Sequence, residues 1–351
     1  MKHKIQELLS NWLNRPTPSY GSNEAEGLGA IASTVGNVRQ ENQDRAVIAR
    51  YVGRFPAESF VFYGLCDGIG GLRDGGVCAS RGLATALVSL VEAGNQNMSG
   101  RMMSAATLAN EDIFNRYHEN GGCTYSAIGV DFRGELFGIN IGDSRIYARG
   151  DGLVAQISSD DNIGSQLQLL GNVGKHTGEF SKQLTQFLGA GQSLQPKRVS
   201  LREEKQGYFI TSDGVHSLGE KLLSEISCSA AVPNDVAKRI ATVAMWCKGT
   251  DNGTIICTPT KLGDLVSRNP SQITGLLEIW DSYEKMQLLV DMEDLRQRPF
   301  VSQKPAVLQA GSAVTNYHQH GEKKKAVARK KKKDFQKGRG APEIEITEDP
   351  I

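Results

Sequence analysis

The sequence is long enough for one large domain with tails or for two domains, and its apolar content is sufficient for a substantial core. It has 351 residues, 39% of them hydrophobic, and a net charge of +1. No apolar run approaches the roughly 20 residues of a membrane-spanning helix, and the N-terminus lacks the apolar stretch of a signal peptide. We therefore expect a soluble, globular, cytoplasmic protein.

Charge is distributed unevenly along the chain. Residues 322–339 carry ten Lys or Arg side chains against two acidic ones, a net charge of +8, which leaves −7 for the rest. An acidic body argues against a nucleic-acid-binding main domain and is compatible with carboxylates gathered for cations. The six cysteines form no CxxC pair, which favours reduced structural thiols over disulfides or zinc ligands.

The N-terminal segment has the apolar spacing of a single amphipathic helix. This pattern covers residues 1–14 and ends at the Arg15-Pro16 step. The polar face of the helix is not strongly basic, so packing on the main domain or on a partner is favoured over membrane contact. We assign residues 1–20 to this helix and its linker.

The middle of the chain mixes strands and helices in blocks. In chain order, the pattern predicts a strand at 60–65, helical stripes at 83–91 and 102–117, a three-stranded meander at 126–150, a strand at 207–215, a helix at 232–247 and a strand at 252–258. Blocks of this kind favour an α+β fold, with helices layered on antiparallel sheets, over a doubly wound parallel sheet.

The composition changes after residue 258. Ile273, Leu276, Leu277 and Trp280 form an apolar stripe that predicts a helical extension over 260–300. Periodicity is lost beyond this point, and we expect residues 301–351 to be a disordered tail, first basic and then acidic. Nucleic acid, anionic lipid or an acidic protein can each bind such a basic run, but a solvated run is favoured.

Four aspartates share one sequence context. Asp67, Asp143, Asp213 and Asp251 each lie at the edge of a strand-like run beside a residue of high turn propensity, in LCDGIGG, INIGDSR, FITSDGV and KGTDNGT. If these strand edges converge, the carboxylates cannot all stay ionised without cations. Oxygen ligands with no His or Cys partner favour Mg²⁺ or Mn²⁺. A nucleotide loop is disfavoured, because Arg73 stands where a third glycine is needed.

These motifs resemble those of the metal-dependent (PPM) protein phosphatases, also called type 2C serine/threonine phosphatases, and a bacterial member in particular. The matches occur in family order as GNVRQENQDR (36–45), DGIGG (67–71), GDSR (142–145), TSDGV (211–215) and DNGT (251–254). The resemblance covers about 25–258, and we assign 21–259 to a phosphatase domain. It implies a four-layer α-β-β-α sandwich of two antiparallel sheets flanked by helices, with a two-metal site at one end.

The resemblance also implies roles for the metal ligands. Asp67 corresponds to the carboxylate that bridges two ions, and Gly68 to a ligand through its carbonyl. Asp213 and Asp251 correspond to ligands of the first ion. Asp143 resembles an aspartate that many bacterial members use at a third metal site. The resemblance therefore implies two Mn²⁺ or Mg²⁺ ions as cofactors, and the position of Asp143 adds the option of a third.

Other matched positions bind phosphate or support the ligands. Arg39 corresponds to the phosphate-binding arginine, while Asp44 and Asn252 correspond to supports behind the metal ligands. Gln43 replaces the usual glutamate, which keeps a hydrogen-bond acceptor but removes one negative charge. Ile69 stands where many eukaryotic members have a histidine that is a candidate general acid, so that acid is missing here.

We therefore expect hydrolysis of phosphoserine and phosphothreonine in proteins by a water activated by two metal ions, without a covalent intermediate. The alternative is a catalytically silent relative that binds phosphoproteins or acts as a scaffold. Residues 158–195 resemble the family's variable flap, where we expect substrate choice to lie. Residues 259–351 are expected to bind a partner, and a chain ending at Pro259 is expected to keep its activity.

Overall fold

The computed structural model describes residues 2–169, 183–202, 207–247, 249–266 and 273–290. The chain divides into two units, Met1–Pro299 and Phe300–Ile351. The second unit contains the predicted basic and acidic tail, and it lies outside the described residues. The expectations for that tail, including its partners, therefore stay predictions.

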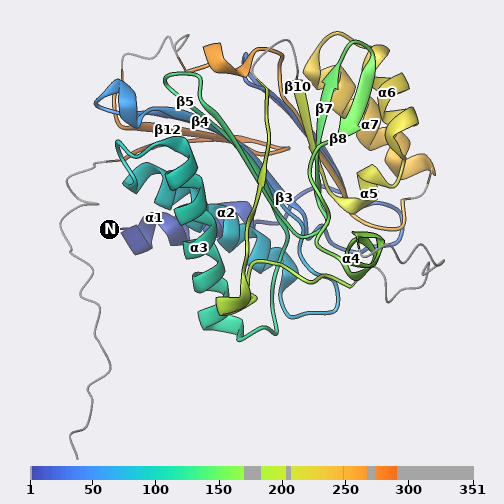
Figure 1. The fold of residues 1–351 in the computed structure, drawn as a ribbon, viewed down its shortest axis with the longest axis horizontal. Coiled ribbons are helices and arrows are strands. Elements are labelled where there is room, and N and C mark those ends of the chain that lie inside the picture. Colours follow the sequence, from blue (N-terminus) through green and yellow to red (C-terminus); the bar gives the residue numbers. More distant parts are fainter. Residues whose placement is uncertain (1, 170–182, 203–206, 248, 267–272, 291–351) are drawn as a thin grey trace, which may run out of the picture. The chain divides into compact units, whose positions relative to one another are not determined.

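Two antiparallel sheets face each other within the first unit (Figure 1). The described strands of one sheet follow the order β1-β2-β11-β10-β7-β8, and those of the other follow β13-β12-β3-β4-β5-β6-β9. The first sheet contains β1 (Tyr20–Ala25), β2 (Gly29–Thr34), β7 (Arg145–Gly150), β8 (Leu153–Gln156), β10 (Gly207–Thr211) and β11 (Gly253–Cys257). The second contains β3 (Arg45–Val52), β4 (Phe60–Cys66), β5 (Tyr125–Asp131), β6 (Leu136–Ile141), β9 (Lys197–Val199), β12 (Leu276–Trp280) and β13 (Lys285–Leu289).

Helices cover the outer faces of both sheets. The helices of the described residues are α1 (Lys2–Leu13), α2 (Gly75–Glu92), α3 (Met98–Tyr117), α4 (Ile163–Leu169), α5 (Asp213–His216), α6 (Glu220–Cys228) and α7 (Pro233–Cys247). Buried side chains of α1, α2 and α3 pack on the sheet that contains β4, and those of α6 and α7 pack on the sheet that contains β10. The predicted α-β-β-α sandwich is confirmed.

Strand β4 shows why the central strands are apolar throughout. All seven of its residues are buried. Phe60 and Phe62 point into the core beneath the helices, whereas Val61, Tyr63 and Leu65 point into the core between the two sheets. Because successive side chains of a strand alternate between its faces, a strand covered on both sides needs apolar residues at every position.

The N-terminal helix belongs to the same structure. Leu9 and Leu13 of α1 are buried in the core that α2 and α3 share with the sheet. Gln6 Nε2 donates a hydrogen bond of 2.7 Å to Thr85 Oγ1 of α2. Packing on the main domain, the interpretation favoured for this helix, is confirmed.

The predicted helix at 273–280 is wrong. Residues 276–280 form strand β12, which makes a β-hairpin with β13 at 285–289. Strand β12 pairs with β3, from Leu276 opposite Val52 to Trp280 opposite Ile48, and β13 pairs with β12 in turn. A short apolar run fits either a helix or a buried strand, and the turn residues at its ends decide between them. Here Asp281 Oδ1 accepts hydrogen bonds from the backbone N–H groups of the next turn, which reverses the chain.

The hairpin is part of the core, so a domain boundary at residue 259 is also wrong. The buried Glu278 of β12 accepts a hydrogen bond of 2.7 Å from Arg50 Nε of β3 and forms an ion pair of 2.7 Å with Lys285 Nζ of β13. Burial alone raises the pKa of Glu278, but hydrogen bonds from Lys285, Gln287 and Arg50 hold it below its ordinary value. The fold therefore continues through Leu289.

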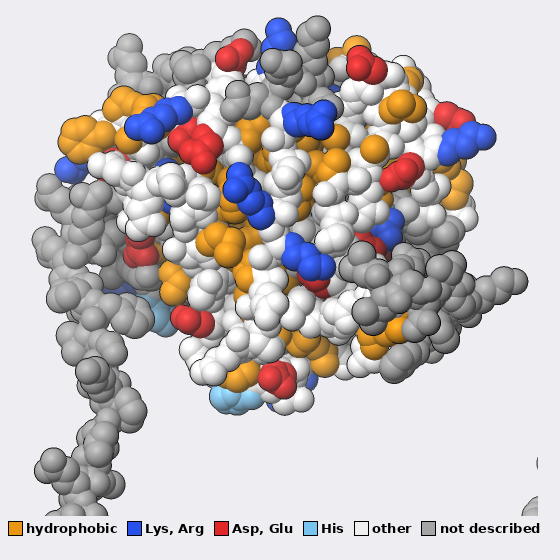
Figure 2. Space-filling view, in the orientation of Figure 1, with side chains coloured by type: hydrophobic (Ala, Val, Ile, Leu, Met, Phe, Trp, Pro, Cys, Tyr) orange, Lys and Arg blue, Asp and Glu red, His pale blue; other side chains and the backbone are white. Residues whose placement is uncertain are grey.

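The described residues also show how charged side chains and cysteine thiols are distributed. Acidic and basic side chains are interspersed over the face drawn in Figure 2, with small apolar areas between them. The six cysteines are free thiols, four of them buried, while Cys228 and Cys247 are exposed. Among the helices described here, none has the length and apolar character that a bilayer crossing requires.

Candidate active site

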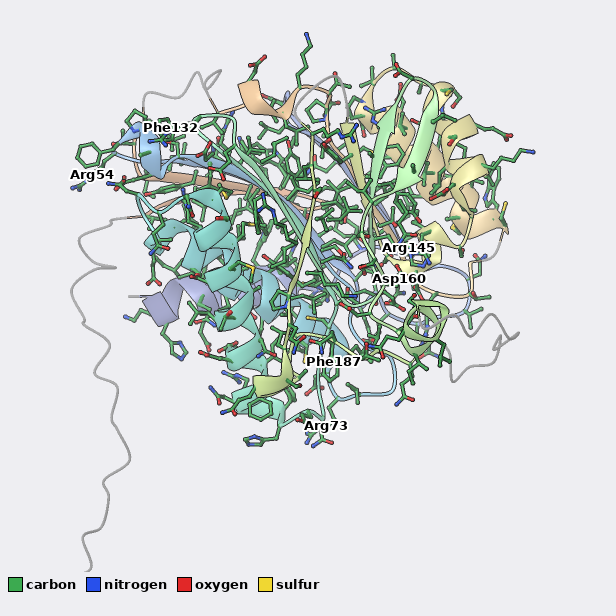
Figure 3. The ribbon with its side chains drawn as sticks, viewed as in Figure 1. Arg54, Arg73, Phe132, Arg145, Asp160 and Phe187 are labelled. Atoms are coloured by element: carbon green, nitrogen blue, oxygen red, sulfur yellow. The ribbon has the colours of Figure 1, made fainter. Side chains whose placement is uncertain are left out.

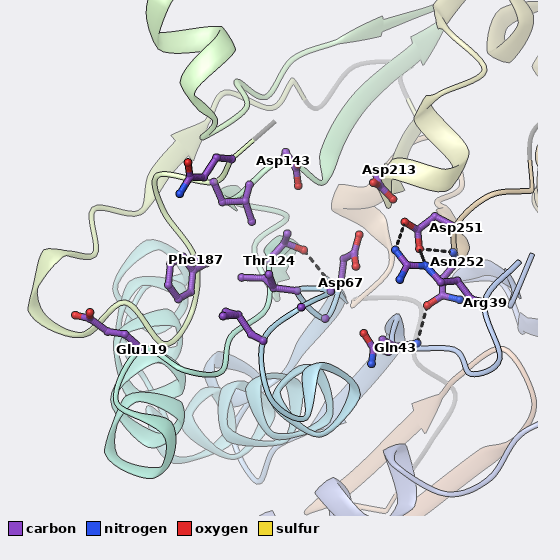
Figure 4. Close-up of a pocket in the computed structure, with 17 residues that line it drawn as sticks. Arg39, Gln43, Asp67, Glu119, Thr124, Asp143, Phe187, Asp213, Asp251 and Asn252 are labelled. Carbon is purple, nitrogen blue, oxygen red and sulfur yellow. Dashed lines mark hydrogen bonds and ion pairs between the residues drawn. The ribbon is translucent and has the colours of Figure 1, made fainter. Parts of the chain in front are cut away.

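The four aspartates of the shared motif context line one cavity of about 630 Å³ (Figure 4). Asp67 follows β4, whereas Asp143 precedes β7, Asp213 begins α5 after β10, and Asp251 lies just before β11. The cavity thus draws on both sheets. We call Asp67, Asp143, Asp213 and Asp251 the acidic half of the cavity.

Burial and neighbouring carboxylates raise the pKa values of Asp67 and Asp213. Burial raises the pKa of Asp67 well above its ordinary value, and the nearby Asp44, Asp213 and Asp143 raise it further. Burial, followed by Asp251, Asp44 and Asp143, raises the pKa of Asp213 to about 7. Negative charge is therefore crowded in a partly desolvated space, which is the electrostatic condition for binding cations.

The loop after Asp67 explains one of the glycines of DGIGG. A Cβ on Gly68 would lie 2.4 Å from the carbonyl carbon of Gly75, the first residue of α2. Only glycine allows the loop to approach the start of this helix so closely. Thr124 holds the same loop, because its Oγ1 accepts a hydrogen bond of 2.9 Å from the backbone N–H of Asp67, and its own N–H donates to the Asp67 carbonyl.

Thr124 was not identified from the sequence. Its Oγ1 is also 2.7 Å from Ser144 Oγ, so it joins the DGIGG loop to the GDSR motif. Both hydroxyl groups are buried. A lone threonine before a strand carries no distinctive pattern, and only the fold brings it beside Asp67.

Arg145 of the GDSR motif lies two residues beyond Asp143 and is paired with Asp160 (Figure 3). Its Nη2 lies 2.7 Å from Asp160 Oδ2. Burial and the Asp160 charge raise the pKa of Asp143 to about 6. Arg145 does not line the cavity with the acidic half. Arg145 instead offsets the negative charge of Asp160, which is a neighbouring charge that raises the pKa of Asp143.

Arg39 lines the cavity but is paired with Asp251. Its Nε and Nη2 donate hydrogen bonds of 2.8 and 2.7 Å to the two carboxylate oxygens. The side chains remain 46% and 33% exposed, respectively. The hydrogen bonds and charge of Asp251 raise the pKa of Arg39 above its ordinary value. A bidentate guanidinium of this kind also fits two oxygens of a phosphate.

The three predicted supports lie close to these residues. Asn252 Oδ1 accepts a hydrogen bond of 2.8 Å from the Gln43 backbone, and its Nδ2 donates to the carbonyl groups of Val35 and Glu41. Asp44 is buried and accepts a hydrogen bond of 2.7 Å from Ser212 Oγ. These contacts tie the loop that carries Arg39 to the segments that carry Asp251 and Asp213.

The acidic half fits hard divalent cations by its donor chemistry. It offers carboxylate oxygens, together with the backbone carbonyl of Gly68, and such donors suit Mg²⁺ and Mn²⁺. As they stand, no three His, Cys, Asp or Glu side chains of the described residues are grouped to hold an ion. The Asp251 carboxylate is directed at Arg39 instead (Figure 4).

The remaining wall of the cavity mixes polar and apolar residues. Four of its apolar side chains, Ile69, Leu72, Leu184 and Phe187, are partly exposed, and we call these four residues the apolar half. Glu119 and Gln183 also line the cavity. Phe187 lies across the cavity from Asp213 and Asp251 in Figure 4. Leu184 and Phe187 come from the described C-terminal part of the predicted flap. No sequence motif marked them.

Solved bacterial structures share this fold. The PPM Ser/Thr phosphatase MsPP from Mycobacterium smegmatis, in complex with cacodylate, is 24% identical; the match covers 66% of this chain and 97% of that chain, with a TM-score of 0.56. Stp1 from Staphylococcus aureus is 20% identical over 68% and 98% of the two chains, with a TM-score of 0.58. The catalytic domain of PstP, in complex with two manganese ions, is 23% identical over 68% and 98%, with a TM-score of 0.54.

No protein-family model and no curated protein matches the sequence. The structural matches nevertheless span nearly the whole of each bacterial phosphatase chain. The chain therefore has the fold of the PPM Ser/Thr phosphatases, as the order of its motifs predicts.

Proposed function

We propose that this protein is a metal-dependent phosphatase that removes phosphate from phosphoserine and phosphothreonine in proteins. The observation that carries the proposal is the acidic half, in which carboxylates from both sheets line one cavity together with Arg39. The fold supports the proposal, because MsPP and Stp1 are named Ser/Thr phosphatases.

Two Mn²⁺ or Mg²⁺ ions are the proposed cofactors. Asp67 would hold both ions, the Gly68 carbonyl one of them, and Asp213 and Asp251 the first ion, with Asp143 left for a third. When bound, the ions supply a nucleophilic water at neutral pH and offset the negative charge of the phosphate. No side chain is needed as a covalent nucleophile.

Arg39 is the proposed phosphate-binding residue. Arg39 Nε and Nη2 now donate to the two carboxylate oxygens of Asp251, and the same two N–H groups would suit two phosphate oxygens if Asp251 held an ion instead. Asn252 keeps the loop of Arg39 in place through its hydrogen bonds to Gln43, Val35 and Glu41. Ile69 donates no proton, so the departing serine or threonine oxygen takes its proton from water.

The test is phosphate release from a phosphoserine peptide by the purified full chain. We expect release with Mn²⁺ or Mg²⁺ and none after excess chelator, with recovery when the ion is added back. An inactive chain that still binds the phosphopeptide would instead identify the silent phosphoprotein-binding alternative. The Asp67→Asn variant serves as the control for phosphatase contamination.

A further inference from the structure

Backbone hydrogen bonds fix the segments that carry the apolar half of the cavity. After β4, residues 67–69, 121–124 and 187–189 lie side by side, with Gly68 paired to Cys123 and Cys123 paired to Leu188. The Cys123 N–H donates to the Leu188 carbonyl at 3.2 Å, and the Leu188 N–H donates back at 2.9 Å. The backbone beside Phe187 is therefore fixed to the loop that carries Asp67.

A glycine makes room for the aromatic ring. A Cβ on Gly122 would lie 2.5 Å from Phe187 Cδ2, so the ring packs directly over the backbone of this residue. The Gly122 carbonyl also accepts a hydrogen bond of 3.1 Å from the Ile69 N–H. One short segment thus positions both Phe187 and Ile69.

Leu184 is held by a separate set of backbone bonds. It pairs with Asn162, and the flanking Thr185 N–H donates to the Asp161 carbonyl at 2.8 Å. On the other side, the Ile163 N–H donates to the Gln183 carbonyl at 3.1 Å. The backbone beside Leu184 and the backbone beside Phe187 are therefore both hydrogen-bonded to other described segments of the chain.

The distance along the chain between the two halves is short. Ile69 is two residues beyond Asp67, and consecutive Cα atoms are about 3.8 Å apart. A phosphorylated residue whose phosphate is held beside Arg39 and the acidic half brings its own chain neighbours into the same cavity. Part of the wall that they meet is apolar, and burying apolar surface against it is favourable.

We propose that Ile69, Leu72, Leu184 and Phe187 form a subsite for an aliphatic or aromatic substrate side chain within two positions of the phosphorylated residue. This inference rests on the proposed phosphatase function and names the class of sequence that the site prefers. Phe187 is the aromatic member of the subsite, and it lines the cavity from a backbone that is hydrogen-bonded to the loop of Asp67 through Leu188 and Cys123.

The first experiment compares phosphoserine peptides that carry either Leu or Asn at each of the four positions nearest the phosphoserine. Leu and Asn have similar size but opposite polarity, so a difference reports apolar burial. We expect kcat/KM with Mn²⁺ to be about tenfold higher for Leu at one or more positions, through a lower KM. Equal values at all four positions would overturn the proposal.

The second experiment assigns the preference to residues. In Phe187→Ala, the ratio of kcat/KM between the Leu and Asn peptides should fall towards one, and Phe187→Leu should restore most of it. Phe55→Ala is the matched control, because Phe55 is a 61% exposed phenylalanine that does not line the cavity. An unchanged ratio in folded Phe187→Ala would remove Phe187 from the subsite and contradict the inference.

A binding measurement separates this inference from the proposed function. Fluorescence anisotropy with non-hydrolysable phosphonate analogues of the Leu and Asn peptides requires no turnover. If the chain releases no phosphate but binds the Leu analogue more tightly, the enzyme proposal fails and the subsite stands. If it releases phosphate and binds both analogues equally, the enzyme proposal stands and the subsite fails.

Discussion

The two halves of the cavity have opposite physical chemistry although they share the same loop. The acidic half brings partly exposed carboxylates close together, and this raises the pKa values of Asp67 and Asp213, so the ionised cavity is destabilised when no cation is bound. The apolar half is held by packing and by backbone hydrogen bonds. In the function proposed above, the first half serves the chemistry and the second the substrate preference, so that the two are separable. The changes below act on both halves, then on the acidic half alone, and then on its charge.

The largest expected effect comes from removing the hairpin that completes the sheet beneath both halves. A chain ending at Pro259 loses β12, whose residues are all buried, and leaves Arg50 without Glu278. We expect it to lack cooperative thermal unfolding and activity, whereas a chain ending at Val290 keeps both. Circular dichroism and Mn²⁺-dependent turnover measure the difference. Wild-type unfolding by the shorter chain would restore the boundary at 259.

Asp67→Asn should abolish turnover while leaving the fold and the apolar half in place. The substitution removes the charge of the residue proposed to hold both ions, and its shape is nearly unchanged. Phosphate release with saturating Mn²⁺ measures the effect. Asp143→Ala is the comparison, and we expect it to reduce activity without eliminating it. Near-normal turnover by Asp67→Asn would rule out the two-ion assignment.

Arg39→Ala should lower kcat/KM by about 10- to 100-fold, because a hydrogen bond to a charged group contributes roughly 1.5 to 3 kcal/mol. The loss should be the same for Leu and Asn peptides, since the proposed contact of Arg39 is with the phosphate and not with the flanking residue. Arg39→Lys tests whether two N–H groups in a fork are needed. A variant with wild-type kinetics would show that Arg39 does no more than pair with Asp251.

The smallest expected effect is on the stability of the ion-free protein. The pKa of Asp213 is about 7 in the folded chain and 3.8 ordinarily, so between these values the folded state binds more protons than the unfolded state. Its stability therefore falls as the pH rises through this window. Asp213→Asn should remove part of that fall and raise the Tm at pH 8 by about 2 to 4 °C.

The measurement is Tm at pH 5 and pH 8 in chelator, for the wild type and for Asp213→Asn. Added Mn²⁺ should raise the wild-type Tm at pH 8 much more than that of the variant, because only the wild type gains the full ligand set. A variant that is less stable than the wild type at pH 8 without ions would show that crowding in the acidic half is not destabilising.

The sequence predicts the acidic half well because each aspartate lies at the edge of a strand-like run next to glycine or another turn residue. This pattern marks the place where a strand ends in a turn, and a few neighbouring residues are enough to encode such a turn. It does not predict the apolar half, since Leu184 and Phe187 gain their meaning only when Cys123 pairs with Leu188. The hairpin was misread for a related reason: the spacing of Leu276, Leu277 and Trp280 fits a helix as well as a fully buried strand, and β3 decides between them by providing an edge to pair with.

Glu278 and its strand have a further consequence for synthesis of the chain. Strand β3 pairs with β4, which follows it closely, but its other edge pairs with β12, which lies near the end of the described residues. While the ribosome makes everything between Val52 and Leu276, the N–H and C=O groups of that edge have no strand to receive them. Open edges of this kind pair with other chains. The hairpin therefore covers an edge of β3 that stays open until residues 276–280 have been made.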